Sequence, residues 1–97
     1  MQRQEMKRIL KSISKPVKKE LFREIYTNEE LLLMEYLYID KINQPWISDE
    51  LNISMRTLTK LHNNCIDQLI NFYYFESYKS LHNEPSCFNK YFTIQTK

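Results

Sequence analysis

The sequence contains no glycine, although an average chain of its 97 residues would contain about seven. Phosphate-binding loops, dinucleotide-binding turns and nucleophile elbows all need glycine where the backbone approaches a ligand or turns sharply. The absence argues against an enzyme built on any of these motifs, and we expect no catalytic activity. It also favours helices, because glycine destabilises a helix interior.

Cysteine and long hydrophobic runs are also scarce. Two cysteines, Cys65 and Cys87, are too few for a disulfide framework, which favours a reducing, cytoplasmic setting. The first residues are too charged for a signal peptide, and no apolar run is long enough for a bilayer. His62, Cys65, His82 and Cys87 could together hold zinc, but their spacing matches no common zinc finger. We therefore expect no metal, no other cofactor and no membrane partner.

Charge is distributed unevenly, although the net charge is only +2. Residues 1–26 form a basic arm with eight Lys or Arg against three Glu, a net charge of +5. Residues 27–52 carry a net charge of −5 and residues 53–97 a net charge of +2. This pattern suits a polyanion bound on one face. A solvated charged surface is the alternative, and charge alone does not separate the two.

The most informative stretch is residues 44–63, QPWISDELNISMRTLTKLHN, which has the pattern of a helix-turn-helix. This unit crosses two helices around a tight turn, so packing dictates which of its positions are apolar. Those positions hold Ile47, Leu51, Ile53, Leu58 and Leu61. The sequence therefore predicts a helix-turn-helix core here, whose second helix enters the major groove of DNA.

Polar residues in the same stretch fit the turn. Ser48 is small where the second helix must cross, and Asn52 tolerates the left-handed turn conformation better than any residue except glycine. Ser54 follows as the N-cap of the recognition helix. Asn43 can cap the first helix, and Trp46 can pack back on the helix before it.

Hydrophobic spacing predicts further helices over residues 3–14, 17–25 and 28–41. Thr27 and Glu30 have the spacing of a capping box at the start of the third. That helix is apolar on most faces, so we expect it to be the central core helix. The spacing of the recognition helix continues to Tyr73, which predicts an unusually long helix.

The C-terminal part predicts a small β-wing within residues 77–96. Residues 88–95, FNKYFTIQ, are rich in aromatic and β-branched residues with partial alternation, which is typical of a strand. A turn cluster at 83–86 precedes them, and residues 78–82 could form the partner strand. The alternative is a helix that runs through to Leu81, with only a short terminal strand.

The exposed first turns of the recognition helix are the expected DNA contacts. Arg56 and Lys60 suit phosphates first, although Arg56 can also make a bidentate contact to guanine. Asn63 could read adenine, and Met55 or Thr57 could touch a thymine methyl group. The alternative is that these are merely exposed helix residues. The candidate DNA-binding residues are Ser54, Met55, Arg56, Thr57, Thr59, Lys60 and Asn63.

Basic residues of the arm are weaker candidates for phosphate contacts. They could equally be the solvated face of a helix whose other side dimerises. These residues are Lys7, Arg8, Lys11, Lys15, Lys18 and Lys19.

The run from Leu21 to Leu69 resembles the DNA-binding helix-turn-helix of Mga-type virulence regulators of Gram-positive bacteria. Those proteins have a short "W-x-S/T…E-L" helix, matched here from Trp46 to Leu51. A segment similar to "L-N-I-S-x-R-T-L" follows, matched by residues 51–58, and then a long helix. Sigma-factor region four and small phage activators share much of the pattern. The resemblance implies a winged helix, either at the amino end of a larger regulator or in a small phage regulator.

We therefore expect a mainly α fold: a winged helix-turn-helix of about five helices, forming a single domain over residues 1–97. It would bind double-stranded DNA specifically and regulate transcription, with a homodimer formed through residues 3–14 or the aromatic stretch around Tyr73. The alternative is an interaction module that docks on RNA polymerase or a host defence protein. A positive face around Arg56 and Lys60 favours DNA, whereas exposed Tyr and Phe there favour a protein partner.

Overall fold

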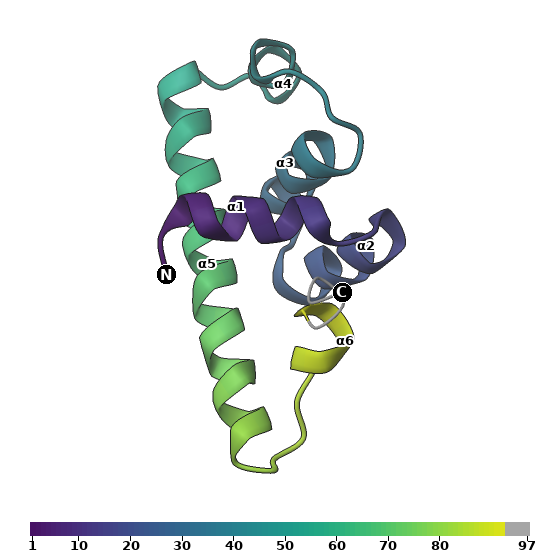
Figure 1. Cartoon of the computed structure of the whole chain (residues 1–97). Coiled ribbons are helices and arrows are strands. Elements are labelled where there is room, and N and C mark those ends of the chain that lie inside the picture. The colour runs from purple at the N-terminus through teal and green to yellow at the C-terminus, as the bar shows by residue number, and fades with distance from the viewer. Residues whose placement is uncertain (93–97) are drawn as a thin grey trace.

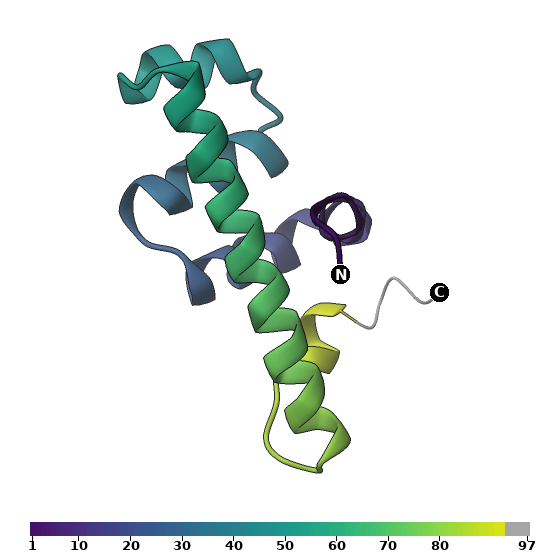
Figure 2. The same cartoon turned by 90° about the vertical axis from the view of Figure 1, so that its left-hand side faces the viewer.

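The computed structural model describes residues 1–92, and these residues form six α-helices and no strand (Figure 1). The helices are α1 (Arg3–Ser12), α2 (Lys15–Ile25), α3 (Asn28–Tyr38), α4 (Gln44–Leu51), α5 (Met55–Leu81) and α6 (Phe88–Phe92). The 27 residues of α5 span about 40 Å at the usual rise. This helix therefore sets the long axis of a molecule that measures 44 × 22 × 21 Å (Figure 2). None of the helices in residues 1–92 is long and apolar enough to cross a bilayer.

The helix boundaries follow local signals at most ends. Pro16 lies in the first turn of α2, where its missing N–H costs nothing. The capping box predicted for α3 is wrong, because Thr27 makes no side-chain capping hydrogen bond. The carboxylate of Glu30 instead accepts a hydrogen bond from the side chain of Gln68 on α5, at 3.0 Å. A contact between helices thus replaces the local one.

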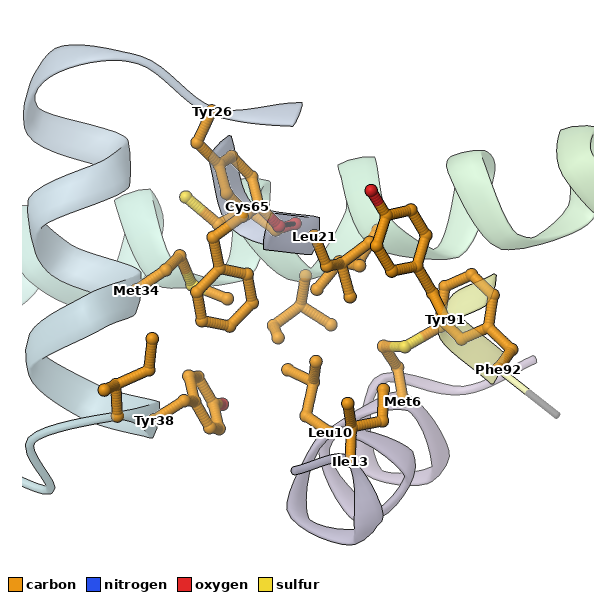
Figure 3. Packing of buried hydrophobic residues seen from close by; sticks show 14 residues of the cluster. Met6, Leu10, Ile13, Leu21, Tyr26, Met34, Tyr38, Cys65, Tyr91 and Phe92 are labelled. Carbon is orange, nitrogen blue, oxygen red and sulfur yellow. Dashed lines mark hydrogen bonds between the residues drawn. The ribbon is translucent and has the colours of Figure 1, made fainter. Parts of the chain in front are cut away.

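α5, rather than the predicted α3, is the central helix. The helices α1, α3, α4 and α6 all pack on it, and Figure 1 shows α1 crossing it near its middle. Figure 3 shows the main core, to which α1, α2, α3, α5 and α6 contribute buried side chains. Its members are Met6, Leu10, Ile13, Leu21, Phe22, Tyr26, Met34, Tyr38, Ile39, Cys65, Ile66, Leu69, Tyr91 and Phe92. Each such apolar side chain stabilises the fold by about 1.5–3 kcal/mol.

Four of residues 1–92 have a positive φ, a conformation that glycine usually supplies. Three are asparagines, Asn28 at 53°, Asn52 at 57° and Asn83 at 58°. Asparagine is the side chain that best tolerates this region after glycine, so it replaces glycine in a chain that has none. The fourth is Lys41 at 57°, between α3 and α4, whose side chain offers no such local compensation.

The predicted β-wing is wrong over the described residues, although the predicted alternative of a helix reaching Leu81 is confirmed. Residues 78–81 belong to α5, and residues 88–92 form α6; residues 93–95 of the predicted strand lie outside the described part. Helical spacing puts Phe88 and Phe92 on one face, where both pack on Tyr73 with ring centroids 5.1 and 4.9 Å away. Packing on α5 therefore overrides the β-propensity of these aromatic residues.

A buried carboxylate fastens the turn between α5 and α6. Glu76 accepts a hydrogen bond from the backbone N–H of Cys87 at 2.8 Å and lies 3.3 Å from the ammonium of Lys79. The hydroxyl of Ser86 donates to the backbone carbonyl of Glu76 at 2.7 Å. Burial alone would raise the pKa of Glu76, but the Cys87 N–H and Lys79 lower it below its ordinary value. The carboxylate is thus held in its charged form.

Candidate nucleic-acid interface

The segment predicted as a helix-turn-helix consists of α4, a three-residue turn and the start of α5. Its small core contains buried Leu33, Ile47 and Leu58, with Leu51, Ile53 and Leu61 packed against them. All five predicted apolar positions therefore face one cluster, to which α3 adds Leu33. This cluster fixes the start of α5 against α4.

The turn has the predicted conformation. Asn52 ends α4 at φ 57° and ψ 46°, in the left-handed region. Ser48 is buried, as the crossing requires, and its hydroxyl donates to the backbone carbonyl of Ile53. The turn thus satisfies polar groups that the close approach of the two helices would otherwise leave without partners.

The predicted caps at both helix starts are confirmed. The side-chain oxygen of Asn43 accepts a hydrogen bond from the backbone N–H of Trp46 at 3.0 Å. The hydroxyl of Ser54 accepts one from the backbone N–H of Thr57 at 3.1 Å. The Trp46 ring packs edge-on against Tyr36 of α3 with centroids 5.5 Å apart, as predicted. Both helices of the unit are therefore held from their first residues.

The first turns of α5 are exposed, which is where sequence reasoning placed the contacts. Ser54, Met55, Arg56, Thr57, Thr59 and Lys60 are all exposed, and Asn63 is partly buried. Arg56 and Lys60 lie four residues apart, so they share one face of the helix. Neither forms an ion pair with any described residue. Their charges are therefore available to a ligand.

Two of the candidate residues are already engaged with each other. The hydroxyl of Ser54 donates to the hydroxyl of Thr57 at 3.0 Å while it caps the helix. Both residues consequently act in shaping the start of α5. Arg56, Thr59, Lys60 and Asn63 remain as the polar side chains of the presented face.

An ion pair of Arg3 next to the candidate interface was not predicted from the sequence. The guanidinium of Arg3 forms two hydrogen bonds of 2.9 Å with the carboxylate of Asp67, four residues beyond Asn63 on α5. This contact holds the pKa of Asp67 below its ordinary value. The pair neutralises the acid next to the presented face, and it marks where α1 begins to cover α5. No sequence signal links two residues 64 positions apart.

The basic arm is not one solvated face. Lys18, one of the weaker candidates for a phosphate contact, is buried, and its ammonium donates to the backbone carbonyl of Tyr38 at 2.9 Å. Lys15 and Lys19 on the same helix are exposed. Desolvation lowers the pKa of Lys18, and the charges of Lys41 and Lys15 lower it further. Lys18 therefore does not belong to the exposed basic surface of α2, to which Lys15 and Lys19 contribute.

The residues considered as zinc ligands have other roles. His62 Nε2 lies 2.7 Å from the hydroxyl of Tyr38, and Cys65 is buried in the main core, where burial raises its pKa to about 12. Within residues 1–92, no three His, Cys, Asp or Glu side chains lie close enough to hold a metal ion.

Comparisons of the chain with protein-family models, with curated proteins and with solved structures found no match. The function of the presented face is therefore inferred from its geometry and charge.

Proposed function

We propose that the chain is a helix-turn-helix protein that binds double-stranded DNA through the first turns of α5 and regulates transcription. The observation that carries the proposal is the start of α5: a capped helix, fixed across α4 by the left-handed turn at Asn52, with Arg56 and Lys60 exposed and unpaired by any described residue. Kinship with the Mga-type regulators remains part of this proposal. The helix-turn-helix pattern of the chain supports this kinship, whereas the lack of a strand in residues 1–92 does not.

The dimensions of the presented face support the fit to a major groove. An α-helix with its side chains is about 10–12 Å in diameter, and the major groove of B-DNA is about 12 Å wide and 8.5 Å deep. An inserted α5 would bring Arg56 and Lys60 to the backbone and Asn63 toward base edges. The contact of Arg3 with Asp67 lies at the far limit of this face, so α1 would meet the edge of the groove.

Charge removal with a matched control tests the proposal. Fluorescence anisotropy of a labelled duplex would be recorded at several salt concentrations with wild type and with Arg56→Ala/Lys60→Ala. If both residues touch phosphates, the slope of log affinity against log salt falls by about two in the double variant. The control is Lys15→Ala/Lys19→Ala, which removes the same charge from exposed positions on α2. Equal losses of affinity in both double variants would show that the duplex is bound only by unspecific charge attraction. No duplex binding by folded wild type at low salt would refute the proposal.

We further propose a homodimer, because one helix-turn-helix reads few base pairs and a two-fold pair reads two half-sites. The apolar face of α1 is an unfavourable interface, because Met6, Leu10 and Ile13 are already buried in the chain's own core. The far end of α5 remains, where Phe75 is 60% and Tyr78 56% exposed. Sedimentation of Phe75→Ser/Tyr78→Ser would give a monomer where wild type gives a dimer; a monomeric wild type would refute this part.

The second candidate function is an interaction module that docks on RNA polymerase or a host defence protein. Trp46 is 46% exposed beside the acidic Asp49 and Glu50 on α4, which suits a partner with basic and apolar groups. The start of α5 exposes Met55 but no Tyr or Phe, which favours DNA there. Loss of RNA polymerase binding in Trp46→Ala, with duplex binding absent in wild type, would favour the interaction module.

A further inference from the structure

Two cavities share lining residues from α1 and α3. The larger, of about 650 Å³, is lined by Lys7, Arg8 and Lys11 of α1, together with Gln4, Leu37, Tyr38, Gln44 and His62. The smaller, of about 300 Å³, is lined by Lys11, Lys18, Leu37, Tyr38 and Lys41. Lys11, Leu37 and Tyr38 line both, so the two cavities form one cleft. Figure 1 shows the helices α1, α3, α4 and α5 that surround its larger part.

The charge of this cleft has one sign. Five cationic side chains line it, and no Asp or Glu of residues 1–92 lines either cavity. We call the cleft lined by Lys7, Arg8, Lys11, Lys18 and Lys41 the basic cleft. Like charges held together repel one another, and a concave surface strengthens their combined field. The field in the basic cleft therefore favours a bound anion.

Lys18 gives the basic cleft a buried donor. It lines the smaller cavity although only 4% of it is exposed. A lysine ammonium carries three N–H donors, and the backbone carbonyl of Tyr38 accepts from one of them. Buried charges are normally paired with an opposite charge. Lys18 therefore has N–H donors for an anionic group, and binding that group would pair its buried charge.

Lys41 is held in the basic cleft by an unfavourable backbone conformation. Its φ of 57° is unfavourable for a residue with a side chain, relative to the right-handed region. The other three positive-φ positions of residues 1–92 are asparagines. Lysine at this position gains no local compensation, but it lines the smaller cavity together with Lys11 and Lys18. Strain of this kind is often found at ligand sites.

We propose that the basic cleft binds a small molecule that carries phosphate groups. Lys11, Lys18 and Lys41 bind a phosphate in the smaller cavity, and Lys7 and Arg8 bind a second anionic group in the larger one. The same chemistry could come from a DNA backbone phosphate. However, a duplex is too wide to enter a cavity of about 300 Å³ and reach a lysine that is 4% exposed. A small phosphorylated molecule can do so.

The basic cleft is also lined by residues of the helix-turn-helix segment. Gln44, which lines it, is the first residue of α4, and His62 lies on α5. A ligand would therefore bridge α1 and α2 to the helix-turn-helix segment. The site itself does not depend on the proposed DNA binding.

Isothermal titration calorimetry with inorganic pyrophosphate at constant ionic strength tests the proposal. Wild type is expected to bind one pyrophosphate per chain in a saturable manner. Lys41→Gly removes an ammonium and accepts the positive φ, so the fold is preserved. Lys18→Met keeps the buried stem but removes the charge. Each variant should bind at least about tenfold more weakly, as expected for one lost charge-assisted hydrogen bond.

Lys19→Gln is the matched control, because Lys19 is exposed on the same helix as Lys18 and lines neither cavity. It should bind pyrophosphate as wild type does. No saturable binding by wild type, or an equal loss in Lys19→Gln, would overturn the proposal. The proposal would also be overturned if wild type bound no pyrophosphate and Lys41→Gly weakened duplex binding, because the basic cleft would then bind DNA. Should Lys18→Met fail to fold, Lys41→Gly still decides the question.

Discussion

His62 should make the stability of the protein depend on pH. The imidazole is buried, and Nε2 contacts the hydroxyl of Tyr38 at 2.7 Å. Burial, and then the nearby charge of Lys7, lowers its pKa from 6.5 to about 4. Arg8 and Lys11, which are also positively charged, line the same cavity. The folded protein therefore keeps His62 neutral at a pH where the unfolded chain is protonated.

The sign and size of the effect follow from this difference. Between pH 4 and 6.5 the unfolded state binds more protons, so stability rises with pH across this range and is complete above it. A difference of this size in pKa corresponds to about 3 kcal/mol of unfolding free energy. His62→Gln keeps a polar partner for Tyr38 and does not titrate.

Urea unfolding of wild type and His62→Gln at pH 7 and pH 4 measures the contribution. The loss of unfolding free energy on acidification should be smaller in the variant by about 3 kcal/mol. Carboxylates titrate alike in both proteins, so they cancel in the comparison. An equal acid-induced loss in the two proteins would refute the reasoning, as would a His62 ring signal in NMR that titrates near pH 6.5 in the folded state.

Substitutions at three further positions test the fold, each by thermal or urea unfolding. Asn52→Val should destabilise the protein by about 1–2 kcal/mol, because a β-branched residue is poorly accommodated at a positive φ, whereas Asn52→Gly should change little; equal effects would contradict the left-handed turn. Leu58→Ala should cost about 2–5 kcal/mol and weaken duplex binding, and a cost under about 0.5 kcal/mol would mean that Leu58 is not in a core. Wild type should lose stability as the pH falls through the lowered pKa of Glu76, and Glu76→Gln should show less of this acid loss; an unchanged acid loss would remove Glu76 from the account.

Local constraints explain why the helix-turn-helix segment could be predicted. The left-handed turn permits few residues, and Asn52 is one of them. The caps at Asn43 and Ser54 involve residues within three positions of each other. The apolar positions follow from the crossing of two neighbouring helices. Each of these features is determined by residues that are close in sequence, so the sequence displays them together.

The C-terminal part could not be predicted because its local and its tertiary preferences differ. Phe88, Tyr91 and Phe92 have helical spacing, but their aromatic character and partial alternation also favour a strand. Packing on Tyr73 selects the helix, and that contact joins separate helices. The β-propensity of these residues indicated a strand, but their packing on α5 decides the structure.

The polar contacts around the candidate site were missed for a related reason. Arg3 reaches Asp67 across 64 positions, and Lys18 reaches Tyr38 across 20. Charge counting identified the N-terminal arm as basic but could not tell that Lys18 is buried. Nor could it show that lysines from α1, α2 and the α3–α4 connection line one cleft.

NMR mapping of a bound duplex would test the central claim most directly. A duplex titrated into the ¹⁵N-labelled protein should shift the backbone amides of residues 54–63 most strongly, with smaller shifts near Arg3. The amides around Phe75 and Tyr78, at the far end of the same helix, should not respond to DNA contact. Shifts confined to that far end or to α3, with residues 54–63 unchanged, would contradict the account.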